Sequence, residues 1–178
     1  RKVEGFAMNQ VSRKVDPVDA TYVITIDNLL KMLSISFRLK YGLPVIIMGE
    51  TGCGKSSLIR QLASIIRAPL FTLNIHGGME DTDILRWMDE CCVEANRFRN
   101  ERILVFLDEV NTTNCMGLFK EIICDHTCNG RYLPDNMLIV SALNPYRLKK
   151  GVGAKEEKMT TTTTTTTTAS ASSIRRRG

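Results

Sequence analysis

Short apolar runs alternate along this chain with longer stretches of helical periodicity, and this alternation limits its fold more than any other feature. A short run that is apolar throughout is typical of a strand buried on both faces of a parallel sheet. We expect such strands at 45–48, 68–78, 102–109 and 137–145. Helical spacing fills the stretches before and between them, at 27–40, 55–66, 79–100 and 115–124. This order predicts an α/β protein in which helices flank a parallel sheet.

The first predicted helix, 27–40, carries clear signals at both ends. Asp27 is a suitable N-cap, Gly42 is a C-cap signal, and Pro44 follows shortly after it. The apolar residues that we expect on the buried side of this helix recur at helical spacing: Leu29, Leu30, Leu33 and Phe37.

The segment GETGCGKS, residues 49–56, follows the first predicted strand and opens the second predicted helix. It fits the pattern G-x-x-x-x-G-K-[ST], which cradles the phosphates of a nucleotide. Glycines let main-chain N–H groups wrap around phosphate oxygens, and a helix N-terminus favours the same anion. Lys55 would add a positive charge near the terminal phosphates, and the Ser56 hydroxyl could ligate Mg²⁺. The predicted nucleotide-binding set is Gly49, Glu50, Thr51, Gly52, Cys53, Gly54, Lys55, Ser56 and Ser57.

Polar residues end two further predicted strands. Asp108 and Glu109 follow the apolar run ILVFL, and Asn144 closes the last strand. The carboxyl ends of parallel strands meet at one edge of a sheet, where ligands bind. We predict that Asp108 and Ser56 hold Mg²⁺ and that Glu109 is the catalytic base for an attacking water. Lys55 and Asn144 complete the predicted catalytic set, with Asn144 sensing the terminal phosphate or the water.

Composition divides the chain into three parts. We expect a linker at 1–20, a domain at 21–150 and a disordered tail at 151–178, because nine consecutive threonines, at 160–168, have no apolar face to bury. The formal net charge is +5, of which the tail supplies +3, so nucleic-acid binding is not expected. No run of about 20 apolar residues suits a membrane span. The polar start lacks a signal peptide and suggests a piece of a longer polypeptide.

The six cysteines are scattered, and they include the adjacent pair Cys91 and Cys92. This arrangement favours reduced thiols in the cytoplasm over a disulfide framework. Cys124, His126 and Cys128 could be imagined as metal ligands. Their spacing lacks a CxxC knuckle, however, so we expect no metal site there.

Together these motifs resemble an AAA+ ATPase with a Walker A loop, a Walker B strand of the D-E-x-N type and a sensor asparagine. More specifically, they resemble an AAA+ unit of the mysterin family, whose members are giant dynein-like ring ATPases and E3 ubiquitin ligases. The segments that carry the resemblance are DNLLKMLSISFRLKYGLPVIIMGETGCGKSSLIRQL, HGG, FLDEVNTT, KEIICDH and ALNPYR, within about residues 22 to 150. The resemblance implies ATP and Mg²⁺ as cofactors, and no guanine-reading NKxD motif occurs.

The resemblance also implies partners. Neighbouring AAA+ units of this family supply an arginine finger, and regions elsewhere in the polypeptide connect it to the ubiquitin machinery and to lipid droplets. No RING-like cysteine and histidine spacing occurs in these 178 residues. A complete unit would continue after Asn144 with a fifth strand and a helical lid, where this chain has the threonine run. The roles of Arg147 and of His76, in a loop that could line the ring, stay open.

Three functions remain to be distinguished. The first is an ATPase module whose hydrolysis drives ring rearrangement, and Glu109 favours it. The second is a unit that holds nucleotide for ring geometry without consuming it. The third, a nucleic-acid-remodelling AAA+ protein, is disfavoured by the aromatic content of 6% and the low charge outside the tail. We further expect the isolated chain to hydrolyse ATP slowly or not at all, because it lacks the neighbour's arginine finger.

Overall fold

The computed structural model describes residues 11–12 and 22–145. The predicted tail and Arg147 lie outside the described residues, as does the predicted linker apart from the two-residue strand β1 (Val11–Ser12). β1 pairs antiparallel with β3 (Leu70–Asn74).

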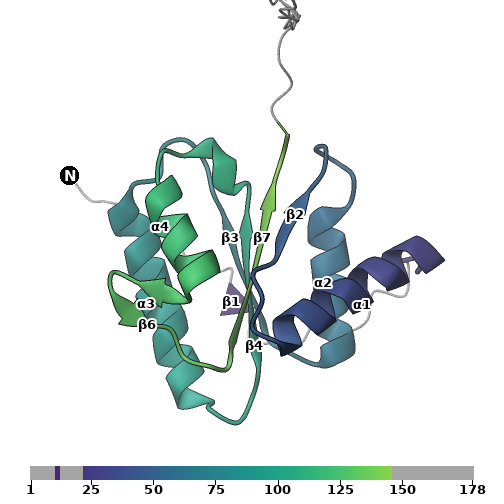
Figure 1. The fold of residues 1–178 in the computed structure, drawn as a ribbon, viewed down its shortest axis with the longest axis horizontal. Helices are drawn as coiled ribbons and strands as arrows, with labels where there is room; N and C mark the ends of the chain where they lie inside the picture. Colours follow the sequence, from purple (N-terminus) through teal and green to yellow (C-terminus); the bar gives the residue numbers. More distant parts are fainter. Residues whose placement is uncertain (1–10, 13–21, 146–178) are drawn as a thin grey trace, which may run out of the picture. The chain divides into compact units, whose positions relative to one another are not determined.

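The described strands form a main sheet in the order β1-β3-β4-β7-β2 (Figure 1). β2 spans Ile46–Met48, β4 spans Ile103–Asp108 and β7 spans Met137–Leu143, and these strands run parallel to one another and to β3. The predicted α/β fold with a parallel sheet is therefore confirmed. β4 lies in the middle of the sheet and is buried over its first five residues, which explains why those five residues are all apolar.

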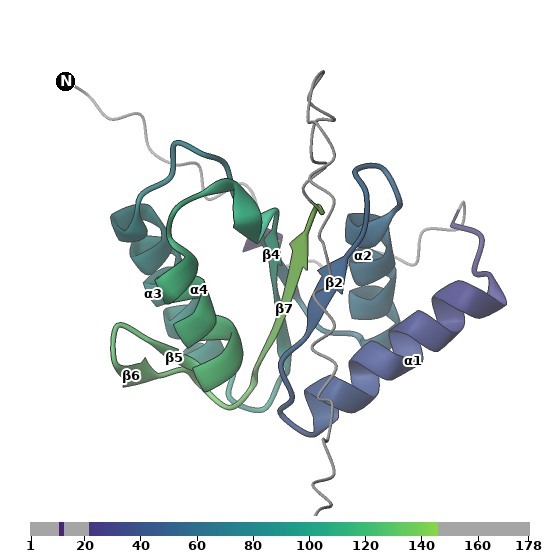
Figure 2. The same ribbon diagram turned by 45° about the horizontal axis from the view of Figure 1, so that its top comes forward.

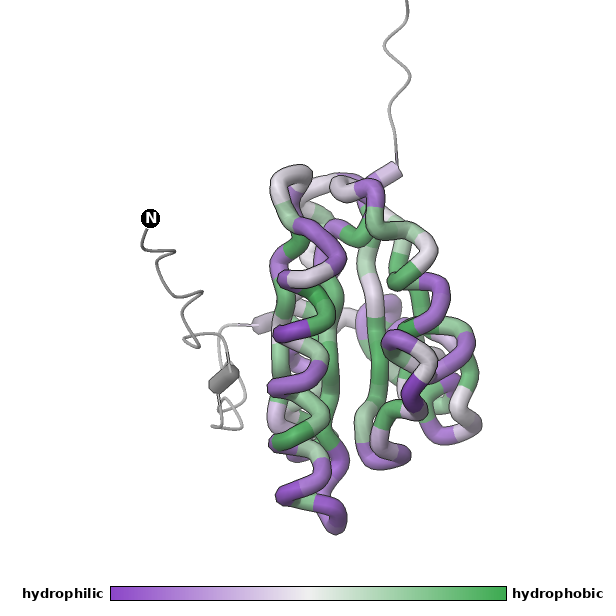
Figure 3. The backbone as a smooth tube through the Cα atoms, turned by 90° about the vertical axis from the view of Figure 1, so that its left-hand side faces the viewer, coloured by the Kyte–Doolittle hydropathy of each residue, from purple (hydrophilic) through white to green (hydrophobic). Residues whose placement is uncertain are grey.

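Helices cover both faces of this sheet (Figures 1 and 2). α1 (Ile26–Lys40) and α2 (Lys55–Ile66) lie on one face, while α3 (Asp81–Arg97) and α4 (Met116–Lys120) lie on the other. α4 continues into a π-helical turn, η3 (Glu121–Asp125). Hydrophilic and hydrophobic residues alternate along the helices, whereas the strand interiors are mostly hydrophobic (Figure 3). Within the described residues, none of the helices has both the length and the apolar character needed to span a bilayer.

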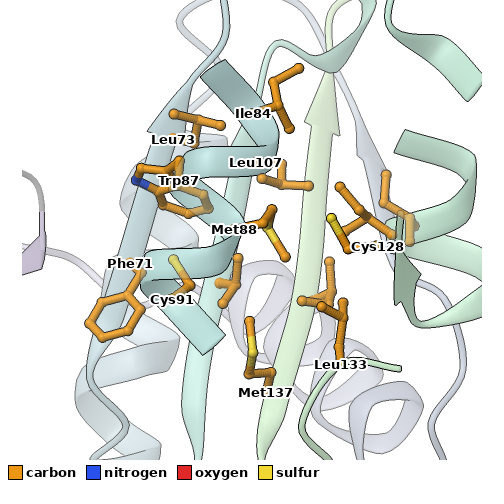
Figure 4. Packing of buried hydrophobic residues seen from close by; sticks show 14 of the residues in the cluster. Phe71, Leu73, Ile84, Trp87, Met88, Cys91, Leu107, Cys128, Leu133 and Met137 are labelled. Atoms are coloured by element: carbon orange, nitrogen blue, oxygen red, sulfur yellow. The ribbon is translucent and has the colours of Figure 1, made fainter. Parts of the chain in front are cut away.

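Each face of the sheet has its own hydrophobic cluster. On the α3 side, Trp87 and Met88 belong to a cluster that includes Val105 of β4 (Figure 4). On the other side, Leu62 of α2 belongs to a cluster that includes Phe106 of β4. Successive residues of β4 thus enter opposite clusters, so the strand that carries Asp108 is held from both faces.

The buried side of α1 differs from the expected one. Met32 and Ile35 are buried in the cluster shared with α2, and Leu39 packs against it. The four residues expected there, Leu29, Leu30, Leu33 and Phe37, are 45–58% exposed. Our prediction was wrong because α1 is apolar along two neighbouring stripes with the same helical spacing, and the stripe that faces α2 is the one that becomes buried.

The N-cap of α1 also differs from the prediction. Thr25 is the N-cap, and its Oγ1 accepts a hydrogen bond from the Asn28 N–H at 3.2 Å. Asp27 lies inside the first turn instead, where its carboxylate pairs with Lys31 at 2.5 Å. At the other end, Gly42 adopts a left-handed φ of 64°, which accords with the predicted end of the helix.

A small antiparallel hairpin of β5 (Thr127–Cys128) and β6 (Arg131–Tyr132) follows η3. Burial raises the pKa of the Cys128 thiol to about 11, so this group stays protonated near neutral pH. Cys124, by contrast, is exposed.

Candidate nucleotide-binding site

The predicted site residues gather where the parallel strands end. Met48 of β2 is in register with Leu143 of β7, so the two strands end side by side. The glycine loop (residues 49–54) follows β2, Asp108 ends β4, and Asn144 follows β7. These strand ends lie together at the upper edge of the sheet in Figure 1.

The glycine loop has the main-chain form that an anion-binding loop requires. Gly52 and Gly54 adopt left-handed φ angles of 82° and 85°, which side chains with a Cβ rarely allow. A Cβ on Gly49 would lie 2.7 Å from the Cys53 Sγ atom, so the loop is closely folded at this point. Side chains of the predicted binding set are exposed at Glu50, Thr51, Cys53 and Ser57.

The N-terminus of α2, beside the glycine loop, lacks the groups that neutralise the corresponding end of α3. Gly54 provides no side-chain cap, and the first turn of α2 holds no acidic residue. At α3, Glu80 and Asp83 form a reciprocal capping box, and Asp81 adds a negative charge to the first turn. The helix dipole therefore leaves a partial positive charge at the start of α2, next to the loop.

Lys55 is the buried cation of this edge, with 9% of its surface exposed. Its Nζ donates to the carbonyl oxygens of Gly49 at 2.8 Å and Glu50 at 3.0 Å. It also donates to the Asn144 Oδ1 atom at 2.7 Å, which joins the start of α2 to the end of β7. These three acceptors match the three protons of the ammonium group.

Ser56 and Asp108 form a second contact across the edge. The Ser56 Oγ atom donates to the Asp108 Oδ2 atom at 2.6 Å. Mg²⁺ is usually held by one or two protein oxygens together with phosphate oxygens and waters. A hydroxyl and a carboxylate side by side fit that donor set, so these two residues could hold the predicted Mg²⁺.

Glu109 follows Asp108 directly, yet its carboxylate contacts a different residue. Its main chain turns into the left-handed region, with φ 61° and ψ 40°, a conformation that costs about 1 kcal/mol or more without glycine. The Glu109 Oε1 atom accepts a hydrogen bond from the Asn144 Nδ2 group at 2.9 Å. Because the Asn144 Oδ1 atom accepts from Lys55, this one amide bridges the loop lysine and the predicted base.

Asn111 is a residue of this edge to which the sequence motifs gave no role. It lies in a short 3₁₀ turn, η2 (Val110–Thr112), directly after Glu109. Its Nδ2 donates to the main-chain oxygen of Asn144 at 2.7 Å, and its Oδ1 accepts from the Asn144 N–H at 3.3 Å. The available signal was its place in the D-E-x-N pattern, three positions after Asp108.

The structure thus brings Lys55, Ser56, Asp108, Glu109 and Asn144 to one edge, where hydrogen bonds join Asn144 to Lys55 and Glu109, and Ser56 to Asp108. Their individual roles in binding and catalysis stay predictions. His76 lies in the exposed turn that follows β3.

Residues 22–147 match a protein family described as "RNF213 AAA domain". This chain belongs to that family. It is 40% identical over 145 residues to the E3 ubiquitin-protein ligase RNF213 of Mus musculus and 38% identical over 147 residues to that of Homo sapiens. The matches cover 75% and 77% of this chain. Among solved structures, a P216G mutant of Thermotoga maritima RuvB matches 68% of this chain and 40% of that one, with 21% identity and a TM-score of 0.48.

The resemblance to the mysterin family is therefore confirmed, and the chain is an AAA+ domain of the kind found in RNF213-like proteins. It spans only 3% of the length of either RNF213 relative.

Proposed function

We propose that this chain is an ATP-binding and ATP-hydrolysing AAA+ module of an RNF213-like ubiquitin ligase, and that nucleotide turnover in it drives ring rearrangement. The observation that carries the proposal is the Asn144 side chain, which contacts both Lys55 and Glu109 at the edge where the glycine loop ends. A purely structural amide would not need to join the cation of a phosphate loop to a carboxylate that follows a buried strand.

Binding would depend on the loop and the start of α2. The left-handed glycines and the N-terminus of α2, which has no side-chain cap, favour binding of a polyphosphate. The Lys55 ammonium group is held at the loop by two main-chain carbonyls. Ser56 and Asp108 would hold Mg²⁺, which when bound neutralises charge on the phosphate oxygens. Triphosphate oxygens would replace Asn144 as the third acceptor of the Lys55 ammonium.

Hydrolysis would depend on Glu109 and Asn144. Glu109 would accept a proton from the attacking water, and Asn144 would orient that water or the terminal phosphate. The Asn144 Nδ2 group has two protons, of which the bond to Glu109 uses one, so the other could serve the water or the phosphate. The adenine base follows from the family rather than from any contact in the chain.

Partners are proposed from the family. A neighbouring AAA+ unit would supply the arginine finger, and such fingers contribute roughly 10³- to 10⁵-fold in rate in P-loop enzymes. We therefore expect the isolated chain to turn over ATP well below about 1 per second. Contact with the ubiquitin machinery and with lipid droplets would occur only through other regions of a longer protein.

The binding part of the proposal is tested by titrating the full chain with a fluorescent ATP analogue and Mg²⁺. We expect saturable binding that Lys55→Ala weakens about tenfold or more, since a buried charge-assisted contact is lost. Lys40→Ala is the matched control, because Lys40 is exposed in α1 and lies over the Tyr41 ring. A folded wild-type chain that takes up no nucleotide would refute the proposal.

A second candidate function is a unit that holds ATP without consuming it. The hydrogen bond between Asn144 and Glu109 favours it, because it occupies an oxygen of the predicted base. The two functions differ in what happens when Glu109 is replaced, because only the hydrolysing module would lose ATP turnover.

A further inference from the structure

Asn111 and Asn144 hold each other through two hydrogen bonds, although 33 residues separate them in the sequence. One bond runs from the Asn111 Nδ2 group to the carbonyl oxygen of Asn144 at 2.7 Å. The other runs from the N–H of Asn144 to the Asn111 Oδ1 atom at 3.3 Å. The amide of Asn111 therefore engages both the donor and the acceptor of one main-chain residue, much as a neighbouring strand would.

This contact lies where the sheet no longer constrains the chain. β7 ends at Leu143, and the ladder between β2 and β7 reaches Met48 and Leu143 but not Asn144. The side-chain amide of Asn144 must nevertheless point toward Lys55 and Glu109. A residue just beyond a strand has freedom in φ and ψ, and fixing its N–H and carbonyl removes most of that freedom.

The turn that carries Asn111 is itself well anchored. Val110, the residue before it, is buried in the cluster on the α3 side with 3% of its surface exposed. Thr112, the residue after it, closes the turn through its N–H, which donates to the Glu109 carbonyl at 3.0 Å. Asn111 therefore connects the turn that follows Glu109 to the residue that contacts the Glu109 side chain.

We propose that Asn111 is a positioning residue, which fixes the main chain of Asn144 so that its side-chain amide is aimed at Glu109 and at the terminal phosphate. The inference rests on the proposed ATPase function. It assigns Asn111 no contact with nucleotide. Its effect should appear in the transition state, where the orientation of Asn144 matters, and hardly at all in the binding of nucleoside diphosphate.

The first measurement follows the main chain of Asn144 in the 178-residue chain. Amide hydrogen exchange by NMR should show the Asn144 N–H protected in wild type and at least tenfold faster in Asn111→Ala, because its acceptor is gone. The Ser141 N–H, which donates to the Val45 carbonyl at 3.0 Å, should exchange at its wild-type rate. Asn111→Asp keeps an acceptor oxygen of the same size and should keep the Asn144 N–H protected.

The second measurement compares two ligands, Mg²⁺–ADP and Mg²⁺–ADP with aluminium fluoride, which mimics the phosphoryl group in transfer. In Asn111→Ala we expect the affinity for Mg²⁺–ADP to stay within about twofold of wild type, and the affinity for the aluminium fluoride complex to fall about tenfold or more. Asn136→Ala is the matched control, because Asn136 also donates to main-chain carbonyls but at the other end of β7. It should change neither affinity.

These measurements test the proposed ATPase function and the positioning role of Asn111 separately. A wild-type chain that binds neither complex overturns the proposed function. Unchanged Asn144 exchange in Asn111→Ala, or an equal loss of affinity for both complexes, overturns the positioning role even if nucleotide binding is confirmed.

Discussion

The two ends of β7 each carry an asparagine, and the two side chains make different kinds of contact. At the amino end, the Asn136 Nδ2 group lies 2.9–3.1 Å from the carbonyl oxygens of Ala95, Phe98 and Glu101. At the carboxyl end, the Asn144 side chain contacts the side chains of Lys55 and Glu109. The same residue type therefore fixes a turn at one end and joins two ionisable groups at the other.

The difference indicates which contacts a ligand can exchange. Main-chain carbonyls that end a helix need a donor in every state of the protein, so Asn136 can be understood from folding alone. Side chains such as Lys55 and Glu109 can move to other partners when phosphate or water arrives. We interpret bonds between charged side chains and an amide at a strand end as the mark of a site, and bonds from an amide to carbonyls as the mark of a structural joint.

The strongest test of this comparison is Glu109→Gln. Loss of a general base should lower the rate of the chemical step by about 10²-fold or more. The affinity for Mg²⁺–ATP should change little, because the glutamine Oε1 atom can still accept a hydrogen bond from Asn144. Single-turnover hydrolysis, measured in the assembled ring whose neighbouring unit supplies the arginine finger, gives the ratio to wild type. Equal rates for the two proteins would favour the nucleotide-holding function.

Asn136→Ala should have the next largest effect, and on stability alone. The variant lacks the amide that donates to the carbonyls at the turn between α3 and β4, and this loss should lower the free energy of unfolding by about 2 kcal/mol. Urea denaturation measures this loss, and the nucleotide titration should give the wild-type affinity for the folded variant. A changed affinity would break the proposed division between the two ends of β7.

Ser56→Ala should weaken Mg²⁺-dependent binding about tenfold, which corresponds to about 1.4 kcal/mol, because one of the two predicted oxygen ligands is lost. Binding measured in excess chelator should stay near wild type, since the phosphate contacts of the loop remain. Ser34→Ala is a suitable control, because the exposed Ser34 hydroxyl donates to the Leu30 carbonyl within α1. An equal loss with and without metal would argue against a ligand role for Ser56.

Thr112→Val should have the smallest effect, and it tests whether position alone makes a residue functional. Thr112 lies at the carboxyl edge, but its hydroxyl is 2.9 Å from the Glu109 carbonyl and 3.1 Å from the Ile75 carbonyl, both main-chain groups. By the reasoning applied to Asn136, the variant should lose about 1 kcal/mol of stability and keep its nucleotide affinity. Thermal unfolding and the same titration give both values, and a folded variant with impaired binding would contradict the prediction.

Features of this protein that depend on nearby residues could be predicted from its sequence. The first five residues of β4 are apolar because helices cover both faces of the sheet, and the glycine loop follows β2 in a pattern whose spacing is itself the signal. The gathering of Asp108, Glu109 and Asn144 also followed from sequence, because parallel strands end at a common edge.

Features that depend on a choice between distant partners could not be predicted. Two stripes of α1 have the same periodicity, and only contact with α2 selects Met32 and Ile35 for burial. Two residues near its start are suitable caps, and Thr25 rather than Asp27 fills that place. The contact between Asn111 and Asn144 gives no periodic signal, because it joins a turn to a strand end 33 residues away.

The unburied stripe of α1 has a consequence for handling the chain in solution. Leu30 and Phe37 are each 58% exposed. On β2, an edge strand of the sheet, Ile46 and Met48 are 51% and 67% exposed. Contacts between such surfaces strengthen on warming and in sulfate, because both conditions favour removal of apolar groups from water. Light scattering should therefore increase on warming and with added sulfate, and chilled dilute buffers should keep the molecules apart.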